Sequence, residues 1–142
     1  MKRKANATWM GALKDGKGII STESGVLKDT QYSFSTRFEN GIGTNPEELI
    51  GAAHAGCFSM ATSVQLGNAG LTAERIHTVA TVTFEKTDAG FTITNIHLDT
   101  TAKIPGATQA QFEAAADAAK AGCPISRALA SVPITMTAKL EG

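Results

Sequence analysis

Residues 44–60 read TNPEELIGAAHAGCFSM, and this stretch decides the fold because it encodes the start of a long helix. Asn45 is a preferred N-cap residue, and Pro46 suits the first helical position. Glu48, at the third position, completes a capping box with Asn45. Glu47 places negative charge beside the positive end of the helix dipole. We therefore predict that a helix begins at Pro46.

The helix that follows is apolar on nearly all of its faces. Small and apolar residues continue from Leu49 to Leu66, and Gly67 or Gly70 can end the helix. A helix without a polar face belongs in the interior of a protein. We expect this one to be central and buried.

The chain before this helix has the alternation typical of β-strands. In the last such segment Tyr32, Phe34 and Phe38 share one parity, whereas Arg37 lies on the other. Arg37 is therefore expected to point away from an aromatic face. The strands predicted here are residues 5–10, 19–21 and 31–38.

Two long alternating segments follow the helix and are joined by Asp88-Ala89-Gly90, a composition typical of a hairpin loop. The alternation shifts phase between Ile93 and Ile96, which indicates a β-bulge. The predicted elements are strands 76–87 and 91–103, a helix from the Thr108 and Gln111 cap to residue 121, a short helix beginning at Cys123-Pro124, and a last strand at 134–140. This order predicts an α+β fold.

Length and composition limit the classes of protein to consider. The 142 residues fit one domain, 1–142, and 42% hydrophobic content is enough for an ordinary core. Thirteen basic and thirteen acidic residues give a net charge of zero, which argues against a nucleic-acid partner. No apolar stretch resembles a secretory signal or a membrane span. We expect a cytoplasmic protein with no membrane partner, in which any disulfide is transient.

Cys57 and Cys123 are the two cysteines of the chain. Cys57 lies too far inside its helix for the dipole to lower its pKa, so a reactive thiolate there needs a cationic neighbour, for which Arg37 is the candidate. The alternative is that Cys57 is a small buried hydrophobic residue. Cys123 starts a helix, where backbone amides favour a thiolate, so local physics makes it the more acidic thiol. The alternative for Cys123 is that it is an ordinary N-cap residue without a reactive thiol.

Glu47 and His54 are the other polar residues near Cys57. Glu47 can share a side of the helix with Cys57, but ten residues at a rise of 1.5 Å put them about 15 Å apart along the axis. A bridging arginine or a second subunit must join them if they share a site; otherwise Glu47 only complements the dipole. His54 and Cys57, at i and i+3, could begin a metal site with Cys123. A hydrolase dyad of Cys57 and His54 lacks an orienting third group.

Taken together, these segments resemble the OsmC/Ohr family of thiol-dependent hydroperoxide reductases. The position of Arg37, between the third predicted strand and the helix, favours the OsmC branch. The segments that carry the resemblance are Gly16-Lys17-Gly18 and residues 21–27, 36–39, 43–60, 88–91 and 120–126.

The resemblance implies roles for four residues, and the sequence matches the family at each of them. Cys57 would be the peroxidatic thiol and Cys123 the resolving thiol, which reverses the preference from local physics. Arg37 would activate Cys57, and Glu47 would orient Arg37 through a bidentate pair. The implied fold has antiparallel sheets wrapped around two long buried helices in an intertwined homodimer, with sites built from both subunits.

The implied activity is reduction of organic hydroperoxides to alcohols in oxidative and osmotic stress defence. Cys57 would become a sulfenic acid and then a disulfide with Cys123, which a dithiol, such as a lipoylated protein, would reduce. No cofactor or metal is required. An apolar pocket lined by Phe38, Phe58 and Met60 would favour alkyl hydroperoxides.

Two other functions compete with this one. A small-molecule or metal-binding module would use both thiols as ligands and would retain zinc. A structural dimer would bury both thiols, which would then be inert.

Overall fold

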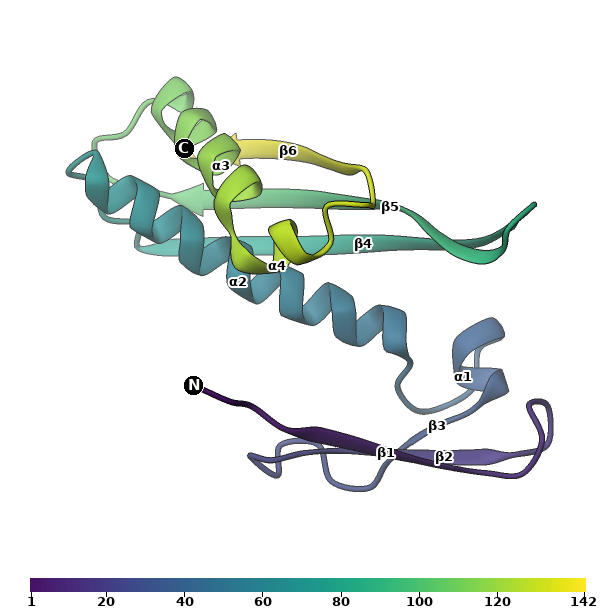
Figure 1. Ribbon diagram of the computed structural model, residues 1–142. Helices are drawn as coiled ribbons and strands as arrows, with labels where there is room; N and C mark the ends of the chain where they lie inside the picture. The colour runs from purple at the N-terminus through teal and green to yellow at the C-terminus, as the bar shows by residue number, and fades with distance from the viewer. The chain divides into compact units, whose positions relative to one another are not determined.

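The computed structural model describes residues 1–142. The chain forms two compact units, Met1–Leu49 and Ile50–Gly142. The first unit contains the sheet β1-β2-β3, and the second contains the sheet β4-β5-β6 with the helices that cover it (Figure 1). A single domain over 1–142 therefore stays a prediction. The α+β class is confirmed.

The sheet of the first unit is antiparallel and consists of β1 (Ala5–Met10), β2 (Lys17–Thr22) and β3 (Thr30–Tyr32). The rings of Trp9 and Tyr32 pack at 5.5 Å between centroids. Gly18 lies opposite both residues in the register. A Cβ at Gly18 would lie 2.4 Å from the Tyr32 ring, so this aromatic packing requires a glycine there.

The predicted strand 31–38 is wrong beyond Tyr32, because the chain turns into the short helix α1 (Phe34–Phe38). The Ser33 hydroxyl accepts a hydrogen bond from the Thr36 amide at 3.3 Å, and the Thr36 hydroxyl accepts one from the Ser33 amide at 2.8 Å. This reciprocal capping box favours helix over strand. Arg37 therefore lies in the last turn of a helix rather than on one face of a strand.

The long helix α2 (Pro46–Asn68) begins where the sequence predicts. Asn45 Oδ1 accepts the Glu48 amide at 2.8 Å, which confirms Asn45 as the cap. The reciprocal half of the predicted capping box is wrong, because the Glu48 carboxylate accepts a hydrogen bond from the Thr44 hydroxyl at 2.8 Å instead. After α2, Gly70 adopts φ +73° and ends the helix, as expected.

The sheet of the second unit contains β4 (Arg75–Thr87), β5 (Gly90–Lys103) and β6 (Ile134–Leu140). β4 and β5 form the predicted hairpin. Thr83 pairs with Asn95 and Phe84 with Ile93, so Thr94 is the extra residue of the predicted bulge.

β6 pairs with β5 in parallel, so this sheet is mixed and the expectation of antiparallel sheets is wrong for this pair. The chain leaves β5, forms α3 (Gln109–Gly122) and α4 (Pro124–Ala128), and returns in the direction of β5. Parallel neighbours need such a crossover connection. The cap of α3 is as predicted: the Thr108 hydroxyl accepts the Gln111 amide, and the Gln111 side chain accepts the Thr108 amide.

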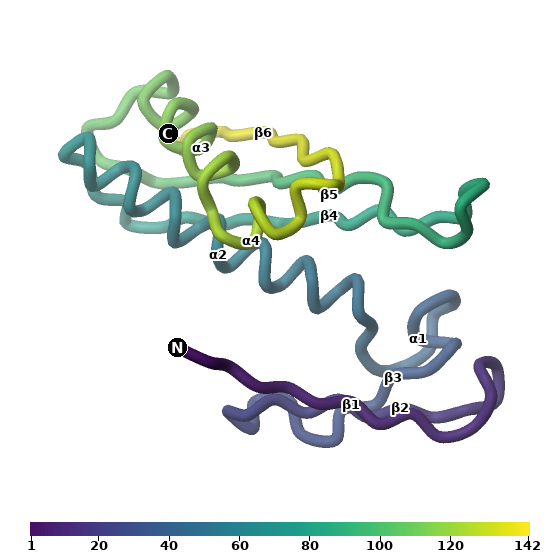
Figure 2. The backbone as a smooth tube through the Cα atoms, viewed as in Figure 1, coloured from purple at the N-terminus to yellow at the C-terminus, as the bar shows by residue number.

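The core of the second unit lies between its sheet and the helices α2 and α3, which run over one side of the sheet (Figure 2). Phe58 and Leu66 of α2, Ile96 and Leu98 of β5, and Phe112 of α3 are fully buried there. The other side of α2 is open: Met60 is 73% and Val64 59% exposed. The expectation that α2 is buried all round is therefore wrong for the single chain.

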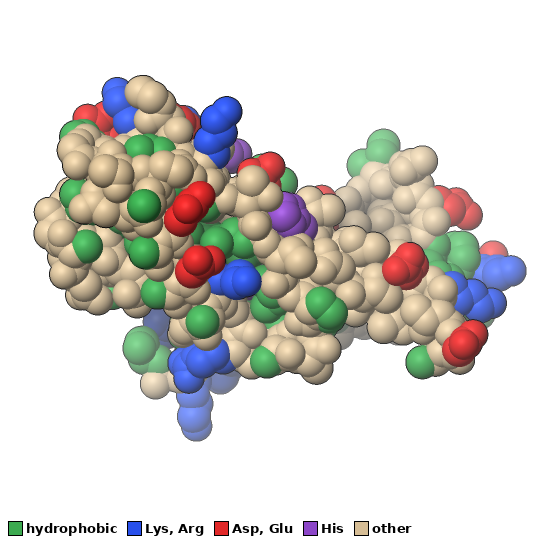
Figure 3. Space-filling model, turned by 90° about the horizontal axis from the view of Figure 1, so that it is seen from above, with side chains coloured by type: hydrophobic (Ala, Val, Ile, Leu, Met, Phe, Trp, Pro, Cys, Tyr) green, Lys and Arg blue, Asp and Glu red, His purple; other side chains and the backbone are tan.

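Both acidic and basic side chains lie on the face seen in Figure 3, where several basic side chains gather at the lower edge. None of the helices combines the length and hydrophobicity needed to cross a membrane.

Candidate active site

The structure brings the two cysteines together. Cys57 lies in α2 and Cys123 caps the N-terminus of α4, and their sulfurs are 2.7 Å apart. Both are free thiols; Cys57 is partly exposed, whereas Cys123 is only 1% exposed. A reagent from solvent therefore reaches Cys57 first.

The junction between α3 and α4 fixes the position of Cys123. The Cys123 amide donates to the Ala119 carbonyl at 2.9 Å and ends α3, while its carbonyl accepts the Arg127 amide at 3.0 Å and begins α4. Pro124 occupies the first position of α4, where its missing N–H costs nothing. The backbone of Cys123 is thus held from both sides.

The surroundings affect the two thiols in opposite directions. Burial raises the pKa of Cys57, and the hydrogen bond and charge of Cys123 raise it further. Burial also acts to raise the pKa of Cys123, but the hydrogen bond with Cys57 and the polar groups of Ser126 and Ile125 outweigh it, so that this pKa is lowered. Within this unit Cys123 is the more acidic thiol, as the local argument expects. An acidic Cys57 requires a cation from elsewhere.

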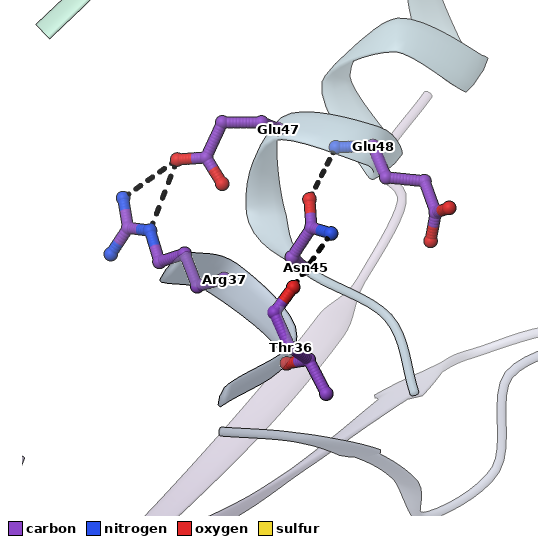
Figure 4. Close-up of polar contacts among 5 residues, drawn as sticks. All are labelled: Thr36, Arg37, Asn45, Glu47 and Glu48. Carbon is purple, nitrogen blue, oxygen red and sulfur yellow. Dashed lines mark hydrogen bonds and ion pairs between the residues drawn. The ribbon is translucent and has the colours of Figure 1, made fainter. Parts of the chain in front are cut away.

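Arg37 and Glu47 form an ion pair in the first unit (Figure 4). Arg37 Nε and Nη2 donate to the same oxygen, Glu47 Oε1, at 3.1 and 2.8 Å. The two residues therefore meet as expected, but through one carboxylate oxygen rather than two. The Arg37 guanidinium also lies 5.6 Å from the centroid of the Phe38 ring.

Asn45 joins the two helices that carry this ion pair. Its Nδ2 donates to the Thr36 carbonyl of α1 at 3.1 Å, while its Oδ1 caps α2 (Figure 4). Glu48 points away from Arg37 in the same view. Sequence reasoning gave Asn45 only the capping role, because the contact with Thr36 depends on the unpredicted helix α1.

His54 is fully buried, and its Nε2 lies 2.7 Å from the Ser126 hydroxyl of α4. Burial lowers its pKa, so the ring is neutral at neutral pH. No group of three or more His, Cys, Asp or Glu side chains is arranged to hold a metal ion. Sequence reasoning missed Ser126, although its position three residues after Cys123 is one from which a side chain reaches the N-cap.

An open apolar cavity of about 550 Å³ lies beside the cysteines, between α2 and the end of α3. Cys57, Met60, Val64 and Cys123 are among its lining residues. Met60 thus lines the cavity as expected, whereas Phe58 is buried in the core on the other side of α2. Phe38 lines a different pocket in the first unit, with Arg37, Trp9 and Tyr32.

The sequence matches the family described as OsmC-like protein over residues 39–137. It is 52% identical to peroxiredoxin OsmC of Escherichia coli strain K12, over 98% of this chain and 96% of that protein. The protein of the same name from Shigella flexneri is also 52% identical over the same shares.

Solved structures share the fold at lower identity. An OsmC-like protein of unknown function from Vibrio cholerae has a TM-score of 0.76 and 16% identity, covering 97% of this chain and 99% of that one. The organic hydroperoxide resistance protein OsmC of Legionella pneumophila has a TM-score of 0.68 and 23% identity, covering 98% and 97%.

Proposed function

This chain belongs to the OsmC-like protein family and is a peroxidase, and we propose that it reduces organic hydroperoxides through Cys57 and Cys123 as part of stress defence. The observation that carries the assignment of residues is the 2.7 Å separation of the two sulfurs. A sulfenic acid formed on Cys57 would have the second thiol already within bonding reach.

The difference in exposure supports Cys57 as the peroxidatic thiol. Cys57 is partly exposed and lines the apolar cavity, whereas Cys123 is buried. The Cys57 thiolate attacks the distal peroxide oxygen; the O–O bond breaks, and the alkoxide takes a proton and leaves as the alcohol. Cys57 then carries the sulfenic acid. The cavity accommodates the organic group of the substrate.

Arg37 and Glu47 complete the site in this proposal. The guanidinium lowers the pKa of Cys57 and stabilises the charge that develops on the peroxide oxygens. Glu47 orients it through charge-assisted hydrogen bonds, which are about twice as strong as neutral ones. Because the pKa of Cys57 is raised within its own unit, this cation is what would make its thiolate available.

A homodimer is the assembly we propose, with residues 1–142 of each chain as one OsmC-like domain. The family match at residues 39–137 crosses the boundary between the two units, which supports one domain. The exposed apolar side chains of α2 support an interface. A cellular dithiol, for example a lipoylated protein, reduces the disulfide, as the reducing cytoplasm that we propose for this protein allows.

The test is to add one equivalent of cumene hydroperoxide to the reduced protein and to measure intact mass and free thiols. We expect a loss of about two mass units per chain and of both thiols, because a disulfide removes two hydrogen atoms. Two remaining thiols with an unchanged mass would refute the proposal, and stoichiometric zinc in the same sample would favour the metal-binding alternative.

A further inference from the structure

The peroxidase scheme leaves two buried polar residues unused, and each lies three positions along the chain from one of the cysteines. His54 precedes Cys57 by three residues, so both project from the same side of α2. Ser126 follows Cys123 by three residues and is the third residue of α4. His54 is 0% and Ser126 4% exposed, and Nε2 of the first lies 2.7 Å from Oγ of the second. The contact thus joins the helices that carry the two sulfurs.

We infer that His54 and Ser126 are positioning residues for the resolving step: His54 Nε2–H holds Ser126 Oγ, and the Ser126 hydroxyl turns its hydrogen to the sulfur of Cys123. The inference rests on the proposed function. The third position of a helix is where a side chain reaches back to the N-cap residue. Cys123 is the N-cap of α4, so its sulfur lies at the helix end to which Ser126 belongs.

The donors in the proposed hydrogen bonds from His54 to Ser126 and from Ser126 to Cys123 follow from the number of available hydrogens. Ser126 has one hydroxyl hydrogen, so if that hydrogen points to Cys123 the hydrogen between Ser126 and His54 must belong to Nε2. Nδ1 of His54 is buried with no hydrogen-bond partner, and the Nε2–H tautomer leaves there a bare acceptor rather than an unpaired N–H. Burial keeps the ring from taking a second proton by lowering its pKa.

The electrostatic surroundings of Cys123 agree with this arrangement. Burial acts to raise the pKa of Cys123. Hydrogen bonds from Cys57 of α2 and from the amide and hydroxyl of Ser126 lower it, and their combined effect is larger. Cys57 is the titratable group that acts on Cys123 from the helix packed against it. For His54, burial is the cause of the lowered pKa.

The chemistry of both later steps needs a stabilised Cys123 thiolate. In closure, the Cys123 thiolate attacks the sulfur of the Cys57 sulfenic acid; the S–S bond forms, the S–O bond breaks, and hydroxide leaves and takes a proton to become water. In reduction, a thiolate of the dithiol attacks the accessible Cys57 sulfur, and Cys123 leaves as a thiolate. The second thiol of the dithiol then releases Cys57. A leaving thiol of lower pKa leaves faster.

The variants that test this are Ser126→Ala, His54→Leu and His54→Gln, with Ser59→Ala as the matched control. Ser59 is also on α2, and its hydroxyl lies 2.8 Å from Thr78 Oγ1 rather than facing the cysteines. The first readout is the pKa of the Cys123 thiol, followed by thiolate absorbance in a Cys57→Ser background. The second is the rate at which the disulfide closes after stoichiometric oxidation.

We expect Ser126→Ala and His54→Leu to raise the Cys123 pKa by about one unit, which slows closure about threefold at neutral pH, because the higher nucleophilicity of the remaining thiolate offsets part of the lost thiolate fraction. The rate of Cys57 oxidation should change less than the rate of closure, because Cys123 is only one of the groups that act on the Cys57 pKa. His54→Gln keeps an N–H donor near the position of Nε2 and should restore most of the effect. Ser59→Ala should match the parent in both readouts.

An unchanged Cys123 pKa in Ser126→Ala would overturn the inference, and so would equal shifts in Ser126→Ala and Ser59→Ala. If His54→Leu does not fold, this pair of serine variants decides alone. The pKa readout needs no peroxide, so a parent protein that forms no disulfide would refute the proposed function while the serine pair still decides the inference.

Discussion

The raised pKa of Cys57 explains why the proposed mechanism needs a cation such as Arg37 beside this thiol. Burial raises this pKa, so without a nearby cation little thiolate is present at neutral pH and more forms as the pH rises. In the proposed mechanism Arg37 supplies the missing positive charge.

Arg37→Ala should therefore slow Cys57 oxidation by about a hundredfold at pH 7, since both the thiolate and the stabilised transition state are lost. The rate of the variant should rise about tenfold per pH unit from neutral pH through the ordinary range of a thiol, because burial raises the pKa of Cys57 above that range. Rapid mixing with cumene hydroperoxide across pH measures this. Arg75→Ala is the control, because Arg75 is an exposed partner of Glu141. A parental rate in Arg37→Ala at pH 7 would remove Arg37 from the mechanism.

Glu47→Gln tests whether the carboxylate charge orients Arg37. The variant keeps the shape of the side chain but replaces a charge-assisted pair, which contributes about 1.5–3 kcal/mol, with a neutral hydrogen bond. We expect Cys57 oxidation to slow about tenfold. Glu48→Gln is the matched control, because Glu48 accepts from Thr44 and faces away from Arg37. Equal rates in the two variants would assign Glu47 to dipole complementation alone.

At the scale of the elements, Asn45 connects helix capping to the candidate site. It caps α2 through Oδ1 and ties α1 to it through Nδ2, and these two functions use different atoms. They can therefore be separated by substitution.

Asn45→Asp should keep the cap, because a carboxylate oxygen accepts the Glu48 amide, but it cannot donate to the Thr36 carbonyl. We expect thermal stability near that of the parent together with slower Cys57 oxidation. Asn45→Ala should lose both functions and about 1 kcal/mol of stability. Thermal unfolding and peroxide kinetics on both variants provide the check; a parental oxidation rate in Asn45→Asp would show that the tie to α1 does not position Arg37.

Helix starts could be predicted where the signal lies within four residues, as at Asn45 and Thr108. The same kind of signal at Ser33 and Thr36 was hidden by the alternation of Tyr32, Phe34 and Phe38, so α1 was missed. The parallel direction of β6 could not be predicted either. Alternating residues such as Ile134 and Met136 give the same period in either direction.

The meeting of Cys57 and Cys123 is a property of the fold of the second unit rather than of any local pattern. It depends on the packing of α2 against the α3–α4 junction, and the residues alone left metal binding and burial open as alternatives. The resemblance to the family supplied the pairing. Neither the sequence patterns nor the family resemblance predicted the His54–Ser126 contact, because it also depends on the packing of α2 against the α3–α4 junction.

At the scale of the whole molecule, the exposed apolar residues of α2 support the proposed interface with a second copy of the chain. Its buried side holds Phe58 and Leu66, yet the other side exposes Met60 and Val64 along with small residues. Leaving such residues in water gives up the free energy of burying them, about 25 cal/mol per Å². An apolar helix face of this kind is typical of an interface.

Met60→Glu should therefore weaken the proposed homodimer, because it would bury an unpaired carboxylate at the interface. We expect the molar mass from sedimentation to fall from that of a dimer to that of a monomer as the concentration is lowered, at concentrations where the parent stays dimeric. Val26→Glu adds the same charge at an exposed position outside α2 and should leave the mass unchanged. If each site needs both subunits, the peroxidase activity per chain of the parent should fall as dilution lowers its dimer fraction. A parent that sediments as a monomer at every concentration would refute the proposed homodimer.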